Sequence, residues 1–230
     1  MKLSGEKQRL AAVGLLLLWC GALIAFRIYL SPDPPYDGKS LPGLAWNLFL
    51  AVVPLAWSLA FRKAGARRPL WAGFFFLLWL LFLPNAPYIL TDLIHLAPRP
   101  GVPLWYVLAM LLSCAGTGTL LGYLSLLNVQ SVIEVQFGKV AGWFVAVAAL
   151  MLCGFGIYLG RFLRWNSWDA LTHPLVLLRT IIGQFLDAEP HPHPVPVTVI
   201  FGTGLIVGYL ALRAIAAPAE PGGTIPARRR

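Results

Sequence analysis

Charged residues are scarce in this chain. Asp, Glu, Lys and Arg make up 12% of its 230 residues, whereas 58% of the residues are hydrophobic. A soluble domain carries about 25% charged residues, so a chain with so few cannot cover the surface of a water-soluble globule. The shortage argues against a soluble enzyme, a disordered chain and a soluble nucleic-acid-binding protein. It indicates a protein with several membrane-spanning helices.

Cysteine and recognisable catalytic motifs are also scarce. The three cysteines, Cys20, Cys114 and Cys153, each lie inside an apolar stretch, as small packing residues of membrane helices do. The sequence has no CxxC pair, no cysteine–histidine cluster and no disulfide-type spacing. It also has no HExxH, GxSxG or P-loop motif. We therefore expect no metal and no cofactor, and the sequence names no reaction.

Long apolar runs are abundant. Six of them approach the roughly 20 residues that a helix needs to cross a bilayer: 10–30, 43–61, a run that begins at Leu70, 104–127, 140–160 and 195–213. The first run is too long for a signal peptide and no small-residue cleavage site follows it, so we expect it to be retained. The predicted fold is all-α, a polytopic transmembrane helix bundle of about six spans in a single domain, 1–216. The tail 217–230 is expected to be disordered, basic and cytoplasmic.

Basic residues are distributed unevenly between the two sides of the membrane. With the N-terminus inside, 12 of the 18 Lys and Arg residues lie on the inner side, including the cluster Arg62, Lys63, Arg67 and Arg68. Because positive residues accumulate on cytoplasmic loops, both termini are expected to be cytoplasmic and the protein to reside in the bacterial inner membrane. The net charge of +9 then reflects topology, so lipids, and no nucleic acid, are the expected partners.

The third run contains an unusual interruption, LPNAPYILTDLIHL (83–96). Its prolines lie about 21–26 Å into a hydrocarbon core of about 30 Å. Irregular backbone at that depth is tolerated only when it is buried in protein or lines a wet cavity. We predict that the third span is broken at Pro84–Pro87. The helical piece that follows places Tyr88, Asp92 and His95 on one face.

A second polar stretch, GIYLGRFLRWNSWD (156–169), closes the fifth run. If the helix continues, Arg161, Arg164 and Trp168 share one face and Asn166 and Asp169 another. Two arginines one turn apart can hold a phosphate or a carboxylate. Because both polar stretches end on the outer side, we expect Asp92 to pair with Arg161 or Arg164.

Two further features concern packing. The segment 173–187 is amphipathic but too short to span, which predicts an interfacial helix between spans five and six. Three GxxxG pairs, Gly118 with Gly122, Gly156 with Gly160, and Gly204 with Gly208, allow helix backbones to approach closely. We expect these pairs to pack within the bundle; the oligomeric state stays open.

The two polar stretches, 83–96 and 156–169, resemble the signature segments of the DUF1361 family of predicted bacterial membrane proteins, and the resemblance extends over roughly 44–212. It implies a multi-pass membrane protein and supplies no assigned catalytic residues.

Three functions remain open. The first is binding of an anionic small molecule or lipid headgroup at an outward-facing polar site. That site would consist of Asn85, Tyr88, Asp92, His95, Arg161, Arg164, Trp165, Asn166, Trp168 and Asp169. The second is a structural or assembly subunit, in which these residues only hold the bundle together. The third is a membrane-embedded enzyme with Asp92 or His95 as general base. An open cavity beside Asp92 would favour a ligand, and a closed, fully paired network would favour a structural role.

Overall fold

The chain folds into a bundle of membrane-spanning helices. The computed structural model describes residues 5–30, 41–97, 101–186 and 193–216, so the expected basic tail, 217–230, lies outside the described residues. Within the described part, six helical segments are long and apolar enough to cross a membrane. The predicted all-α bundle of about six spans is therefore confirmed, and the chain is a multi-pass membrane protein.

The helical elements have the following bounds: α1 (Gly5–Leu30), α2 (Leu41–Ala64), η1 (Gly65–Arg67), α3 (Pro69–Phe82), α4 (Asn85–Tyr88), η2 (Ile89–His95), α5 (Leu104–Phe137), α6 (Lys139–Arg161), α7 (Asp169–Thr172), α8 (Pro174–Leu186) and α9 (Pro194–Ala216). The spans are α1, α2, α3 together with α4 and η2, α5, α6 and α9.

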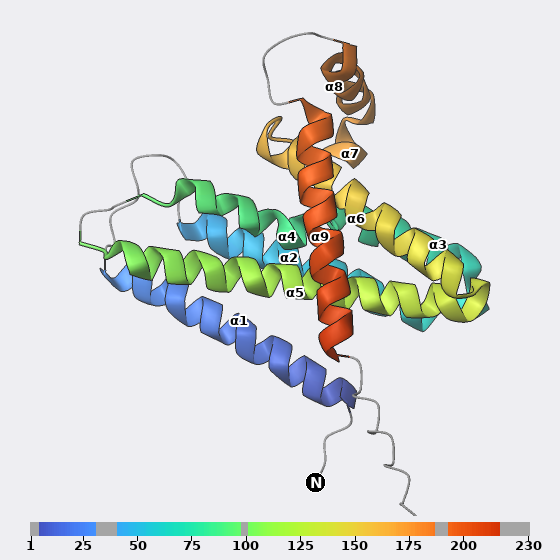
Figure 1. The fold of residues 1–230 in the computed structure, drawn as a ribbon, viewed down its shortest axis with the longest axis horizontal. Helices are drawn as coiled ribbons and strands as arrows, with labels where there is room; N and C mark the ends of the chain where they lie inside the picture. Colours follow the sequence, from blue (N-terminus) through green and yellow to red (C-terminus); the bar gives the residue numbers. More distant parts are fainter. Residues whose placement is uncertain (1–4, 31–40, 98–100, 187–192, 217–230) are drawn as a thin grey trace, which may run out of the picture.

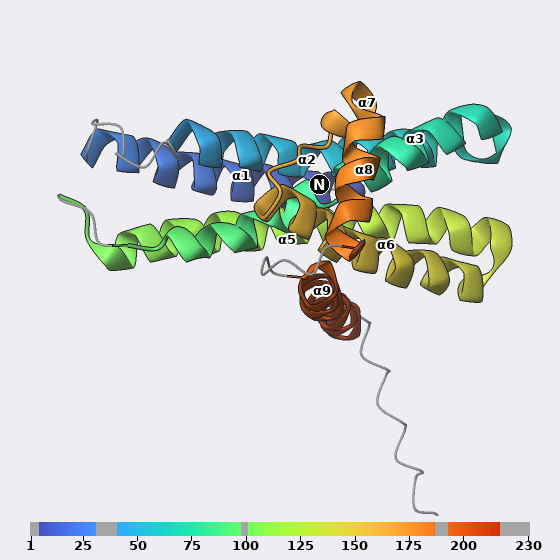
Figure 2. The same ribbon diagram turned by 90° about the horizontal axis from the view of Figure 1, so that it is seen from above.

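The spans are arranged in two groups with α9 outside them. Seen from above, α1, α2 and α3 lie on one side of the molecule and α5 and α6 on the other, while α9 is viewed nearly along its axis (Figure 2). The turn between α2 and α3 and the turn between α5 and α6 lie at the same end of the bundle (Figure 1). One apolar core joins α1, α2 and α5, and a second joins α2, α3, α5, α6 and α9. Side chains from spans distant in sequence therefore meet in two apolar cores.

The third span is interrupted where the two prolines predict it. Helix α3 ends at Phe82, Leu83 and Pro84 form a turn, and α4 begins at Asn85. Proline has no N–H to donate, so the regular α-helical ladder cannot pass through Pro84 and Pro87. The backbone nevertheless stays in the right-handed helical region at Leu83 and Pro84, and the span ends as the tighter 3-10 helix η2. The interruption is therefore confirmed, but it is confined to Leu83 and Pro84 because Pro87 lies inside α4, and the span tightens without unwinding.

Glycines on two other helices receive this interrupted segment. A Cβ atom on Gly118 would collide with the backbone carbonyl of Ala86. On α6, a Cβ atom on Gly156 would collide with the ring of Pro84, and one on Gly160 would press on the ring of Tyr88 at 3.0 Å. The GxxxG pairs of α5 and α6 thus pack inside the molecule, as expected, because only glycine leaves room for so close an approach.

Helix α5 is longer than the apolar run that predicts it. It continues past residue 127 to Phe137. Its polar C-terminal end is stabilised by α9, since Tyr209 donates to Gln130 and Arg213 Nη1 lies 3.9 Å from Glu134 Oε1. Within α5, Gln130 donates to Glu134 at 2.8 Å. A hydropathy pattern ends the span where polar residues begin, whereas the helix continues because those residues find hydrogen-bond partners.

The short helix α8 coincides with the amphipathic segment expected at 173–187. It packs beside the C-terminal end of α6, where the Tyr158 hydroxyl donates to Gln184 Oε1 at 2.8 Å and the Phe155 and Phe185 rings stack. Apolar side chains such as Leu175 and Phe185 stay exposed. A helix with this pattern suits the boundary between headgroups and hydrocarbon.

Candidate functional site

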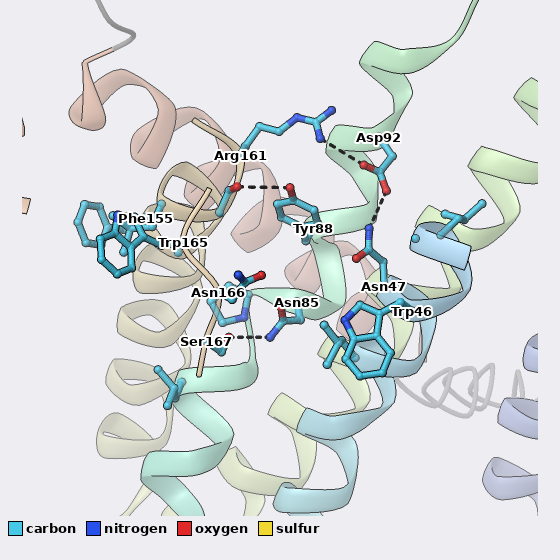
Figure 3. Close-up of a pocket in the computed structure, with 18 of the residues that line it drawn as sticks. Trp46, Asn47, Asn85, Tyr88, Asp92, Phe155, Arg161, Trp165, Asn166 and Ser167 are labelled. Atoms are coloured by element: carbon cyan, nitrogen blue, oxygen red, sulfur yellow. Dashed lines mark hydrogen bonds and ion pairs between the residues drawn. The ribbon is translucent and has the colours of Figure 1, made fainter. Parts of the chain in front are cut away.

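A cavity of about 650 Å³ lies where the C-terminal ends of α1, the third span and α6 meet the N-terminal ends of α2 and α5. Its polar lining residues come from α1, α2, the interrupted third span, α6 and the loop after α6. They are Arg27, Asn47, Asn85, Tyr88, Asp92, Arg161, Trp165, Asn166 and Ser167. Figure 3 shows most of these side chains on facing walls of the cavity. The two polar stretches of the sequence therefore meet around one hollow.

Asp92 holds two walls of the cavity together. Its Oδ1 lies 3.3 Å from Nη1 of Arg161, and its Oδ2 accepts a hydrogen bond from Nδ2 of Asn47 at 3.1 Å (Figure 3). The Asp92 side chain is 14% exposed and that of Arg161 is 7% exposed. The predicted pairing of Asp92 with one of the two arginines is confirmed for Arg161.

Arg161 is oriented by the interrupted span as well as by Asp92. Its Nη2 donates to the backbone oxygen of Thr91 at 2.7 Å, and its guanidinium lies 5.9 Å from the centre of the Tyr88 ring. The Tyr88 hydroxyl donates to the backbone oxygen of Gly160 at 3.4 Å. These contacts fix the guanidinium at the cavity wall.

The loop after α6 is joined to the interruption through Asn85. Nδ2 of Asn85 donates to Oγ of Ser167 at 2.8 Å and to the backbone oxygen of Phe82 at 3.0 Å. The second bond gives the Phe82 carbonyl a donor at the end of α3. Its usual helical partner, the N–H of Ala86, donates to the Leu83 oxygen instead. Asn85 thus stabilises the helix end and places Ser167 on the cavity wall.

The charge of the cavity is positive among its described lining residues. Arg27 is 5% exposed and reaches the cavity from the C-terminal end of α1. Arg27 and Arg161 supply two cationic groups, and Asp92 supplies one carboxylate.

The loop after α6 corrects one expectation from the sequence. Arg161, Arg164 and Trp168 do not share a helical face, because α6 ends at Arg161. Arg164 adopts a left-handed conformation with φ 58°, and the N–H of Trp165 donates to the Leu159 oxygen at 3.1 Å. This turn redirects the chain. The described cavity lining includes Trp165 and Asn166 from this loop but not Arg164, Trp168 or Asp169.

Trp168 and Asp169 have contacts of their own outside the described cavity lining. Asp169 Oδ2 accepts a hydrogen bond from the backbone N–H of Asn166 at 2.7 Å, which closes the turn before α7. The Trp168 ring lies edge-on to Trp46, with ring centres 6.5 Å apart. His95 is the last residue of η2, and its side chain lies outside the described part of the chain. Among the described residues, no group of three or more His, Cys, Asp or Glu is arranged to hold a metal ion.

Among the polar and tryptophan residues of the lining, sequence reasoning missed Arg27, Trp46, Asn47 and Ser167. Two of them carried a usable signal, because Arg27 and Asn47 are isolated polar residues within apolar spans. Polar groups at such positions face the bundle interior more often than lipid. Ser167 carried no such signal, since a serine in a polar loop is ordinary.

Comparison with known proteins gives one match. The model of the family described as "Protein of unknown function (DUF1361)" matches residues 46–207. No curated protein and no solved structure matches the chain. The matched region contains every cavity-lining residue named above except Arg27. Since the match covers more than half of a chain that crosses the membrane six times, this protein belongs to the DUF1361 family.

Proposed function

We propose that this protein binds an anionic group, carried by a small molecule or a lipid headgroup, in the cavity at the outer ends of its spans. The observation that carries the proposal is the pair of buried arginines, Arg27 and Arg161, on the wall of a cavity that also holds Asp92. A carboxylate or phosphate bound there would lie beside two guanidinium groups, which donate charge-assisted hydrogen bonds to such oxygens.

The neutral polar residues of the cavity support the same proposal. Asn47, Asn85 and Asn166 carry amide donors, and Ser167 carries a hydroxyl. Amide and hydroxyl donors complement the oxygen atoms of an anion while the arginines supply the charge. A binding site of this size, with a few convergent polar groups on apolar walls, is typical of small-molecule sites.

The contacts of Asp92 and the adjoining cavity bear on the two alternative functions, the membrane-embedded enzyme and the structural or assembly subunit. Asp92 is engaged with Asn47 and Arg161, which suits a residue that positions the arginine better than a general base. A purely structural role would need no hollow, and the cavity of about 650 Å³ beside this pair favours a ligand. The enzyme and the assembly subunit therefore remain alternatives with less support.

Orientation is part of the proposal. We infer that both termini are cytoplasmic, that the membrane is a bacterial inner membrane and that the cavity faces outward. The basic residues Arg62, Lys63, Arg67 and Arg68 lie beside the turn between α2 and α3. Positive residues of short loops are retained on the cytoplasmic side.

Binding is tested with the full chain purified in detergent and two probes, dioleoylphosphatidylglycerol and glycerol 3-phosphate. At least one probe should raise the melting temperature, and zwitterionic phosphatidylcholine should not. Arg27→Gln and the charge-neutral pair Asp92→Asn with Arg161→Gln should lose the effect, while Arg164→Gln, a matched control outside the cavity lining, should keep it. An equal shift in all variants, or no shift with either probe, would contradict the proposal.

Orientation is tested by cysteine labelling in intact cells. Ala66 and Ala97 are both exposed and lie on loops at opposite ends of spans. The native Cys20, Cys114 and Cys153 are buried, so they contribute little background. A membrane-impermeant maleimide should label Ala97→Cys and not Ala66→Cys. Labelling of Ala66→Cys alone would invert the orientation.

A further inference from the structure

The cavity lining changes from polar to apolar along α6. Arg161 lies at the outer end of this helix, and Leu159, Phe155 and Leu152 line the cavity towards its other end. The helix rises about 13 Å between Leu152 and Arg161. On the opposite wall, Leu77, Leu80 and Leu81 of α3 are also apolar. The cavity thus has a polar outer part and an apolar part that reaches towards the middle of the membrane.

The apolar part is open to the hydrocarbon. Leu77 is 65% exposed and Leu152 is 52% exposed, although both line the cavity. An exposed leucine in the middle of a membrane span faces lipid. Helices α3 and α6 lie in different groups of the bundle, on opposite sides in Figure 2. Close contact between the third span and α6 is made at Pro84 and Gly156. The two helices therefore border a cleft that leads from the polar end into the bilayer.

We propose that the ligand of the cavity is a membrane lipid, with its anionic headgroup beside Arg161 and its hydrocarbon chain in the cleft between α3 and α6. This inference rests on the proposed function and adds the class of ligand. An apolar cleft at this depth is filled by hydrocarbon in any case, because water there would lack hydrogen-bond partners. A molecule that carries both an anionic group and a hydrocarbon chain complements the polar and the apolar part of the lining. A water-soluble anion complements only the polar part.

The experiment compares a phosphodiester lipid, which carries hydrocarbon chains, with a phosphomonoester that carries none. Binding of dioleoylphosphatidylglycerol to the full chain is measured by native mass spectrometry, and binding of glycerol 3-phosphate by calorimetry. Leu152→Trp and, from the opposite wall, Leu81→Trp fill the cleft without touching the arginines. Val147→Trp is the matched control, because Val147 is an exposed residue on α6 outside the described lining.

We expect the lipid to bind at least about tenfold more tightly than glycerol 3-phosphate. Both cleft-filling variants should weaken lipid binding and leave glycerol 3-phosphate binding unchanged, while Val147→Trp should change neither. Equal affinities for the two probes, with no effect of either cleft-filling variant, would overturn the lipid inference and leave the anion site standing. Unchanged binding of both probes by the charge-neutral Asp92→Asn, Arg161→Gln protein would instead overturn the proposed function.

Discussion

Gly118 of α5 lies against the backbone carbonyl of Ala86, so α5 and the interrupted third span touch with no side chain between them. This contact sets the position of Asn85, Tyr88 and Asp92 relative to the rest of the bundle, because all three belong to the same interrupted segment. The cavity therefore depends on a glycine that does not line it.

Gly118→Ala should lower the melting temperature of the purified protein. The added methyl group meets a backbone oxygen that cannot rotate away, and overpacking of this kind costs about 1–3 kcal/mol. Gly116→Ala is the matched control, since Gly116 lies on the same helix and a methyl carbon added there would have no neighbouring atom within 4 Å. Equal melting temperatures for the two variants would show that the third span can shift without cost.

Asp92→Ala should reduce the yield of folded protein more than Asp92→Asn. Removing the carboxylate leaves Arg161, whose side chain is 7% exposed, without its ion-pair partner. The loss for a buried pair is about 3–5 kcal/mol. The asparagine amide oxygen still accepts a hydrogen bond from arginine. Fluorescence-detected size-exclusion chromatography measures the yield, and a wild-type yield for Asp92→Ala with lost ligand binding would assign Asp92 to the ligand alone.

Ser167→Ala should loosen the loop after α6. It removes the acceptor of the 2.8 Å bond from Asn85 Nδ2, which should cost about 0.5–1.5 kcal/mol. Ser167→Thr retains the hydroxyl and serves as the conservative control. Hydrogen exchange of residues 163–169 should increase in the alanine variant only. The same increase in both variants would assign the effect to packing at residue 167.

Tyr209→Phe should destabilise the inner end of the bundle. The Tyr209 hydroxyl donates to Gln130, and each of these two residues is 1% exposed. Loss of the donor leaves the Gln130 oxygen buried without this bond, at a cost of about 1–3 kcal/mol. Tyr29→Phe changes a tyrosine that is 81% exposed and should leave the melting temperature unchanged. Equal changes of melting temperature for the two substitutions would show that the Tyr209–Gln130 hydrogen bond does not stabilise the bundle.

The spans and the interruption could be predicted because they depend on local chemistry. A run of apolar residues must be helical in a bilayer, where every backbone group needs a partner within the chain. Pro84 and Pro87 cannot donate to the helical ladder, so two prolines four residues or fewer apart favour an interruption, whereas the single Pro54 lies inside the continuous α2. The pairing of Asp92 with Arg161 was also predictable, since span counting brings both to the same side and a lone charge near hydrocarbon is costly.

Tertiary structure decided which side chains surround the cavity. Arg27 and Asn47 reach it because of the rotation of α1 and α2, and the sequence of a helix does not set its rotation against its neighbours. Arg164 leaves it because the chain turns after Arg161. Such rotations and turns follow from close contacts such as Gly118 with Ala86 and Gly156 with Pro84, which form only when distant spans pack together. The sequence by itself determined the helices and their interruption, and packing between helices determined the site.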